Sequence, residues 1–298
     1  MTRKEFLIQK QKEAQNRYVK NHEAFYTNPS IARMDPFPIA DGLYYVGDHK
    51  VCIHLIHTEE GLILIDSGFF GAAHLLVDSI WRAGFDPREL RWIIHTHGHS
   101  DHFGASEEFR RMYGTKLAIS RVDAQRLGKL EKYELSGFPF AKMPSFDYEI
   151  EDGEIFQLGS KKIRCVLTPG HTEGVLSLFF DVSYEGKTHL VGRFGGAGVR
   201  AVSLPSMCCN NSSLDMPRKM LDSIEKIWNE PVTIHLGNHP GDNHTLEKRE
   251  QQLKEGGNPF IDSCSWHNFL SSLRKKVKKT MEANEELEKE MKALCEEE

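Results

Sequence analysis

Three histidines and an aspartate fall within six positions of the segment IIHTHGHSDHFG, residues 93–104. The apolar residues before them are typical of a buried strand, which would present the polar side chains at its end. Alternate residues of an extended segment project to the same side, so His97 and His99 can bind one ion. Asp101 and His102 lie where the chain is expected to turn into a helix, and they can face a second ion. The segment predicts a metal centre, and the alternative is a His-rich polar turn without metal.

Two later loops each present a histidine after an apolar run. In the segment TPGHTEG, His171 lies in a tight turn between glycine and threonine. In the segment HLGNHPGDNH, His239 lies between asparagine and proline, and His235 and His244 are its neighbours. Taken alone, each loop is a weak indication, because a single loop histidine is more often solvated than bound to a metal.

The elements around these loops predict an α/β protein in which helices cover a sheet. Short β-rich runs such as LYYVG, VCIHLIH and LILIDSG follow one another from residue 43 and are separated by turn residues. Helical stretches then alternate with buried strands. The polar residues of IIHTHGHSDHFG would therefore emerge at the end of a strand of this sheet.

In this order, the three histidine segments resemble the metallo-β-lactamase superfamily over roughly residues 40–245. LILIDSG, which contains Asp66, is similar to a secondary signature of that family. The resemblance implies the family's four-layer αβ/βα sandwich with two internally similar halves. It also implies two metal sites, whose ligands would be His97, His99 and His171 in the first and Asp101, His102 and His239 in the second. His235 and His244 are alternatives for the last of these ligands.

The run HLVGRFGGAG departs from the common pattern of the family. Most hydrolases of the superfamily have an aspartate here that bridges both metals, and this chain has Arg193. The ligand set is therefore most similar to the β-lactamase subclass with His/His/His and Asp/His/His zinc sites, and the second site could bind its metal weakly. Arg193 would either point away and pair with a surface carboxylate, which we favour, or bind a substrate carboxylate.

The ligand types suggest a mechanism. Three neutral imidazoles leave a zinc ion with an open position, where the pKa of a bound water falls to about 7. Asp101 would orient the resulting hydroxide and accept its remaining proton, which makes it the candidate catalytic residue. Asp66 would fix the orientation of a ligand ring, and the alternative is that it is a turn residue at the end of a strand.

We therefore expect a dinuclear zinc hydrolase that uses a metal-bound hydroxide to open a cyclic amide or ester. The enzyme would be β-lactamase-like and would act on a small metabolic substrate. One alternative is a thioester or lactone hydrolase of the glyoxalase II or lactonase type, against which the absent bridging aspartate counts. Another is an iron-dependent oxidoreductase on the same fold, whose di-iron members usually carry Glu where His99 stands. A third is a catalytically inactive scaffold.

Composition argues against a nucleic acid or a membrane as partner, and it suggests a cytoplasmic location. The 298 residues contain 38 Lys and Arg against 43 Asp and Glu, a net charge of −5 that indicates neither a nucleic acid nor an anionic membrane as partner. No run approaches the roughly 20 apolar residues of a membrane span. The opening residues MTRKEFLIQKQKEAQ lack the apolar core of a secretory signal, and the six cysteines show no disulfide framework. We expect a cytoplasmic protein.

Three regions are expected along the chain. Residues 1–40 would form an N-terminal helix, over about 4–26, and an extended arm. Residues 41–245 would form the metallo-β-lactamase domain, and 246–298 a helical extension. Between the metal motifs, the irregular segment 128–148 has aromatic residues that either face the substrate or pack locally. They are Tyr133, Phe138, Phe140, Phe146 and Tyr148.

The helical extension has apolar residues at coiled-coil spacing. Its seam would consist of Leu273, Val277, Thr280, Asn284, Leu287, Met291 and Leu294. Asn284 would take an a position and Leu287 and Leu294 d positions, a pattern that favours a parallel dimer. The alternative is an amphipathic helix that lies against its own domain.

Overall fold

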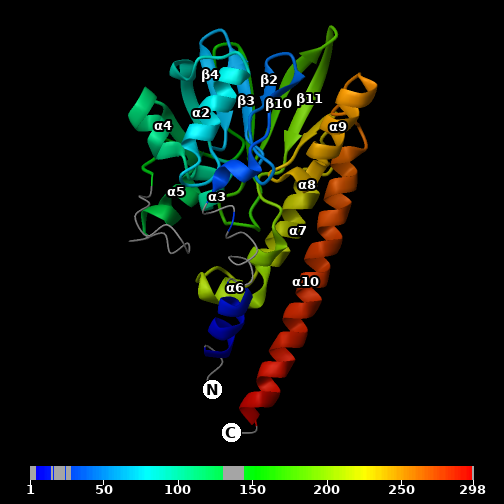
Figure 1. Ribbon diagram of the computed structural model, residues 1–298. Coiled ribbons are helices and arrows are strands. Elements are labelled where there is room, and N and C mark those ends of the chain that lie inside the picture. Colours follow the sequence, from blue (N-terminus) through cyan, green and yellow to red (C-terminus); the bar gives the residue numbers. More distant parts are fainter. Residues whose placement is uncertain (1–4, 15, 17–23, 25–27, 130–143, 297–298) are drawn as a thin grey trace.

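The computed structural model describes residues 5–14, 16, 24, 28–129 and 144–296. Residues 5–14 are helical, as are residues 16 and 24, and the rest of the helix expected over 4–26 lies outside the described residues. Two sheets stand face to face, with helices on the outer side of each (Figure 1). No helix of the described residues is long and apolar enough to cross a membrane.

The first sheet has seven strands in sequence order. They are β1 (Phe37–Ala40), β2 (Leu43–Tyr45), β3 (His54–Thr58), β4 (Gly61–Ile65), β5 (Leu90–Ile94), β6 (Lys116–Ser120) and β7 (Tyr148–Ile150). Strands β1 to β4 are antiparallel neighbours, joined by tight turns except for the loop 46–53 between β2 and β3, whereas β4 to β7 run parallel. Parallel neighbours need crossover connections. In this sheet the crossovers contain the helices α2 (Ala73–Arg82), α3 (Ser100–Phe103), α4 (Ser106–Tyr113) and α5 (Arg121–Gly128) and the 3-10 turn η2 (Pro87–Glu89). A further 3-10 turn, η1 (Pro29–Ala32), precedes β1.

The second sheet has five strands in the order β12-β11-β10-β9-β8. They are β8 (Ile155–Leu158), β9 (Lys161–Leu167), β10 (Leu176–Tyr184), β11 (Lys187–Arg193) and β12 (Ile234–Leu236). The pair β11 and β12 is parallel, and η3 (Val199–Val202), α6 (Leu204–Cys209) and α7 (Met216–Lys226) connect its strands. After β12 the chain continues through α8 (Pro240–Asn243), α9 (Thr245–Glu255) and α10 (Ser265–Glu296).

Apolar side chains separate the four layers. One cluster fills the space between the sheets, where Ile56 and Ile94 of the first meet Leu178 and Val191 of the second. A second cluster lies between the first sheet and helices α2 and α4, and a third between the second sheet and helices α7 and α10. Burial of both faces explains why inner strands such as β4 and β10 are apolar along most of their length. The helix–sheet–sheet–helix order confirms the predicted αβ/βα sandwich.

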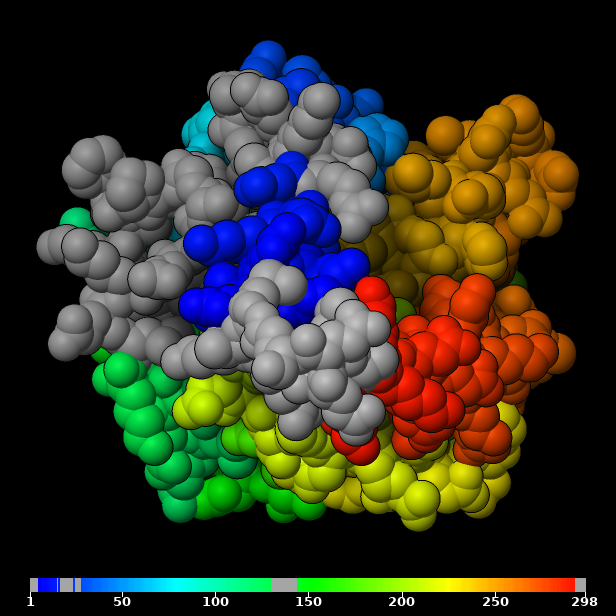
Figure 2. Space-filling view, turned by 90° about the horizontal axis from the view of Figure 1, so that it is seen from below, coloured from blue at the N-terminus to red at the C-terminus, as the bar shows by residue number. Residues whose placement is uncertain are grey.

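Helix α10 lies along its own domain, beside α7 (Figure 1). Its seam residues Leu273 and Val277 are buried in the cluster that covers the second sheet. Further along, Met291 contacts Phe6 and Leu7, so that the N-terminal helix (blue) lies beside the end of α10 (red) in Figure 2. The described seam residues therefore follow the alternative of a helix packed on its own domain, because the same chain already covers them. A homodimer through this helix stays a prediction.

Candidate metal centre

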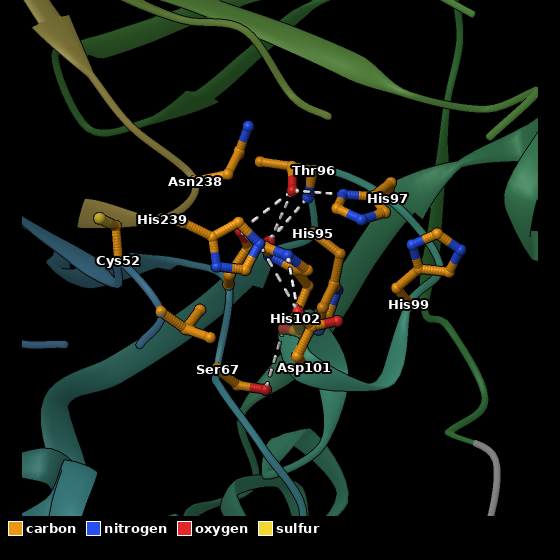
Figure 3. A network of polar contacts seen from close by, with 12 residues as sticks. Cys52, Ser67, His95, Thr96, His97, His99, Asp101, His102, Asn238 and His239 are labelled. Carbon is orange, nitrogen blue, oxygen red and sulfur yellow. Dashed lines mark hydrogen bonds and ion pairs between the residues drawn. The ribbon is translucent and has the colours of Figure 1, made fainter. Parts of the chain in front are cut away.

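The loop that follows β5 and the short helix α3 provide four of the six expected ligands. His97 and His99 come from the loop, and Asp101 and His102 come from the first turn of α3. His97 and His102 are almost completely buried, whereas Asp101 is 19% exposed. Figure 3 shows His97 and His99 on one side of the cluster and Asp101 and His102 on the other. The tight spacing in the sequence thus becomes two adjacent groups.

The first group consists of His97, His99 and His171, which contribute one nitrogen atom each within 4.8 Å of one another. His171 lies in the loop between β9 and β10. Its Nδ1 is 2.7 Å from the Gly198 carbonyl oxygen. A carbonyl oxygen can only accept a hydrogen bond, so Nδ1 of the neutral ring carries the proton and Nε2 has a free lone pair. That Nε2 lies 2.9 Å from His99 Nδ1.

The ring of His97 is oriented by its neighbour. Thr96 Oγ1 donates to the carboxylate of Asp66, which can only accept, and it therefore accepts from His97 Nδ1 at 3.1 Å. His97 Nε2 is then unprotonated, and it is buried without a hydrogen-bond partner among the described residues. An unpartnered buried nitrogen costs free energy unless something binds it. A metal cation would be a suitable partner, because it can accept the lone pair of His97 Nε2 together with those of the neighbouring imidazoles.

The second group consists of Asp101, His102 and His239, also within 4.8 Å of one another. His102 Nδ1 donates to Asp66 Oδ2 at 2.8 Å, and His239 Nδ1 donates to the Lys50 carbonyl oxygen at 2.8 Å. Both rings therefore direct Nε2 toward Asp101, and these atoms lie 3.5 Å and 3.7 Å from Asp101 Oδ2. His239 lies at the start of α8 and its side chain is 47% exposed, so the second group opens toward solvent.

Electrostatics favours neutral imidazoles in the first group, whereas in the second group Asp101 and Asp66 outweigh burial and raise the pKa of His102. Burial, and then the neighbouring histidines, hold the pKa values of His97 and His99 well below the ordinary range, and burial lowers the pKa of His171 to about 4. Burial alone would raise the pKa of Asp101, but His102 and His239 outweigh it and the net shift is downward. Neutral imidazoles and an ionised carboxylate are the species that coordinate zinc.

Asp66 and Arg193 form a buried ion pair behind the second group. Asp66 follows β4 with a φ of 65°, a conformation that few residues other than glycine adopt. Its carboxylate binds Arg193 and His102 together. Burial opposes the charge of Asp66, but Arg193 and His102 outweigh it and hold the pKa of Asp66 well below its ordinary value. Asp66 thus fixes the ring of His102 and stays ionised.

The two interpretations of Arg193 made from the sequence are both wrong. Its side chain is fully buried, so it cannot pair with a surface carboxylate, and its partner is Asp66. Nor can it bind a substrate carboxylate, because its N–H groups are already directed to acceptors inside the protein. The reason is that β11 is an inner strand of the second sheet and Arg193 projects from its end into the layer between the sheets.

Of the aromatic residues expected near the substrate, Tyr133, Phe138 and Phe140 lie outside the described residues. The ring of Phe146 packs on His95 at a centroid distance of 5.4 Å. Tyr148, in β7, packs against Trp92 and Phe156. For the two described residues, local packing is therefore the arrangement in the structure.

Neither alternative for the last ligand belongs to a group of metal-binding residues within the described chain. His235 is buried between Trp266 and Phe269, and its Nδ1 lies 3.3 Å from Ser265 Oγ. His244 has left-handed backbone and forms the junction between α8 and α9. His239 is the histidine of this segment that joins Asp101 and His102.

Asp123 is a residue of the site that sequence reasoning missed. It lies in α5 and is fully buried, and it accepts hydrogen bonds from the Gly98 amide and the Thr172 hydroxyl, both at 2.7 Å. Gly98 separates His97 from His99, and Thr172 follows His171. A single aspartate in the first turn of a helix is common in any protein, so the sequence contains no signal for this role.

Comparisons with known proteins agree with this geometry. A model of the metallo-beta-lactamase superfamily matches residues 46–183. The native FEZ-1 metallo-beta-lactamase from Legionella gormanii superposes with a TM-score of 0.78 at 25% identity, covering 85% of this chain and 98% of that one. BJP-1, a subclass B3 metallo-beta-lactamase of Bradyrhizobium japonicum, superposes with a TM-score of 0.76 at 24% identity, covering 86% and 97%.

Curated relatives match over shorter stretches. An N-acyl homoserine lactonase from a Bacillus species is 26% identical over 162 residues, which are 47% of this chain and 61% of the lactonase. Three of the curated relatives are matched over 19% to 61% of their own length. The matched family model, the four-layer fold and the two ligand groups agree, and we conclude that this chain carries a metallo-beta-lactamase superfamily domain.

Proposed function

We propose that the protein is a metallo-β-lactamase-like hydrolase with two zinc ions, which opens a cyclic amide or ester. The observation that carries the proposal is the orientation of the histidines. His97, His102, His171 and His239 each have a partner on Nδ1 within the protein, which leaves Nε2 of each ring directed into its group. Such partners are typical of metal-binding histidines, whose tautomer they fix.

The donor atoms present fit zinc. His97, His99 and His171 would hold one ion, and Asp101, His102 and His239 the other. When bound, such a pair of ions activates water and polarises the carbonyl group that is attacked. Asp101 is ionised and partly exposed, so its carboxylate can orient a water molecule and accept a proton from it. The exposed side of His239 is where a small substrate would approach.

The lactonases among the relatives favour the ester side of this proposal. A lactone and a β-lactam both present a ring carbonyl, and both are opened when water adds to it. Arg193 in place of the expected bridging aspartate favours the amide side, because it leaves a ligand set without a bridging carboxylate. A substrate panel should therefore contain both ring types.

The test is elemental analysis of the purified protein, with nitrocefin and lactone hydrolysis measured on the same sample. We expect about two zinc ions per chain and ring opening that a chelator abolishes. The double variant His97→Ala/His99→Ala should lose zinc from the first site and all hydrolysis. His74→Ala, which removes an exposed histidine of α2, is the matched control and should keep both. Iron in place of zinc without hydrolysis, or activity retained in the double variant, would refute the proposal.

A further inference from the structure

Arg193 is hydrogen-bonded to residues beside both histidines of the second group. Its Nη2 binds the carboxylate of Asp66, which in turn accepts the proton of His102 Nδ1 at 2.8 Å. Its Nε donates to Asn238 Oδ1 at 3.1 Å, and Asn238 directly precedes His239. One guanidinium therefore reaches His102 through one acceptor and the His239 loop through another.

The remaining contacts fix Arg193 itself. Nη1 donates to His54 Nδ1 at 3.0 Å, and Nη2 also donates to the Cys52 carbonyl oxygen at 3.2 Å. Burial, and then the charge of Arg193, hold the pKa of His54 well below its ordinary value, so His54 is a neutral acceptor. Four acceptors from three other segments of the chain thus surround one buried, planar cation.

Asp123 has the corresponding place behind the first group. Its Oδ2 accepts from the Gly98 amide and from the Thr172 hydroxyl at 2.7 Å, and its Oδ1 accepts from the Gly174 amide at 3.2 Å. It therefore ties the loop that carries His97 and His99 to the loop that carries His171. These loops are separated by about 70 residues of sequence, and the carboxylate of Asp123 accepts from both of them.

We propose that Arg193 and Asp123 are positioning residues that each organise one metal site, Arg193 the Asp101/His102/His239 site and Asp123 the His97/His99/His171 site. The inference rests on the proposed function, since it assumes that both groups bind metal. It adds that each residue acts mainly on one site, although Asp66 also reaches His97 of the first site through Thr96 Oγ1. Arg193 and Asp123 have no contact in common among the described residues.

The physical reason is preorganisation. A metal site binds tightly when its ligands are held in place before the ion arrives, and loss of a residue that orients the ligands typically costs about 10–100-fold in affinity. The guanidinium of Arg193 has five N–H donors in a fixed plane, whereas a lysine ammonium is a single point on a flexible chain. Lysine at this position would keep the charge that Asp66 needs, but it could not reach Asp66 and Asn238 at once.

The experiment is a Co²⁺ titration of the metal-free full-length protein, followed by absorption spectroscopy and by competition with a chelator. The wild type should bind two equivalents, whose spectra differ because three imidazoles form one site and a carboxylate with two imidazoles forms the other. In Arg193→Lys, the affinity for the equivalent with the carboxylate-site spectrum should fall about 10–100-fold, and the affinity for the other equivalent should fall much less. In Asp123→Asn, the equivalent bound by three imidazoles should be the one that loses affinity.

Two further variants keep the test decisive. Asn238→Ala removes the link to His239 but leaves the ion pair of Arg193 and Asp66 intact, so it should weaken the same equivalent even if Arg193→Lys fails to fold. Arg164→Lys is the matched control, because Arg164 pairs with Glu230 at 2.6 Å and stacks on Phe179 away from both groups. It should leave both equivalents unchanged.

The outcomes separate the inference from the proposed function. If Arg193→Lys and Asp123→Asn weaken both equivalents equally, or neither of them, the inference is wrong while the proposed function stands. If the wild type binds no more than one equivalent of Co²⁺ or of Zn²⁺, the dinuclear function itself is wrong. Hydrolysis is not needed for either conclusion, because the readout is metal binding.

Discussion

At the scale of single residues, burial decides how a charged or titrating side chain behaves. A buried arginine is tolerated only with an opposite charge and with acceptors for its N–H groups, and Arg193 has both in Asp66, Asn238, His54 and the Cys52 carbonyl. The sequence shows Arg193 between a glycine and a phenylalanine, with no indication of which carboxylate it contacts. Its partner Asp66 is 127 positions away.

His235 should make the protein less stable in acid. Burial, and then Lys248, lower the pKa of His235 to about 3 in the folded protein from an ordinary value of 6.5. Between these values the unfolded chain binds the proton and the folded one does not, so the free energy of unfolding falls as the pH falls through about 6.5 toward 3. His235→Phe should reduce that slope by up to about 1.4 kcal/mol per pH unit. Denaturant unfolding of both proteins at several pH values measures it, and parallel curves would contradict the assignment.

At the scale of elements, the position of α3 depends on close backbone contact with the loop that follows β4. The Ser67 amide donates to the His102 carbonyl oxygen and the Gly104 amide to the Gly68 carbonyl oxygen, both at 2.8 Å. A Cβ atom at Gly104 would lie 2.2 Å from the Phe70 nitrogen. The absence of a side chain at this position therefore allows the helix that carries Asp101 and His102 to reach the loop of Asp66.

Gly104→Ala should displace α3 and so act on both stability and metal binding. Relief of the overlap requires backbone movement, which we expect to cost about 1–3 kcal/mol of unfolding free energy. The second metal equivalent should weaken as well, because Asp101 and His102 move. Gly128→Ala in α5 is the control, since a Cβ atom there meets nothing within 4 Å. Denaturant unfolding and metal titration check both effects, and equal stability of the two variants would contradict the explanation.

At the scale of the whole molecule, α10 joins the outer face of the second sheet to the N-terminal helix. Asn284, which coiled-coil spacing would place in a dimer seam, instead binds its own chain. Its Oδ1 accepts from the Leu204 amide at 2.7 Å, and its Nδ2 donates to the Val202 carbonyl oxygen at 3.0 Å. A seam asparagine and an asparagine that caps a neighbouring turn have the same spacing in sequence, so periodicity alone could not separate them.

Asn284→Ala should destabilise the monomeric unit. It leaves the Leu204 amide and the Val202 carbonyl without their partner, which typically costs about 1–3 kcal/mol for buried groups. Glu285→Ala, on the exposed side of α10, should have little effect. Thermal unfolding measures the loss, and sedimentation measures the oligomeric state. If Asn284 lay in a dimer seam, the alanine variant would instead gain stability or change its oligomeric state.

Local patterns in the sequence were enough to predict four of the candidate metal ligands and the class of fold. Its His-x-His-x-Asp-His segment lies within six residues, and the alternation of a strand and the turn of a helix set the directions of those side chains without help from distant residues. Apolar runs likewise indicated a layered α/β protein, because the period of a strand or helix is a local property. Three features became visible in the folded chain alone: Asp66 is the partner of Arg193, Asp123 joins the two loops of the first group, and α10 packs on its own domain. These contacts join residues far apart in the chain, and they depend on how the layers pack, which no local period encodes.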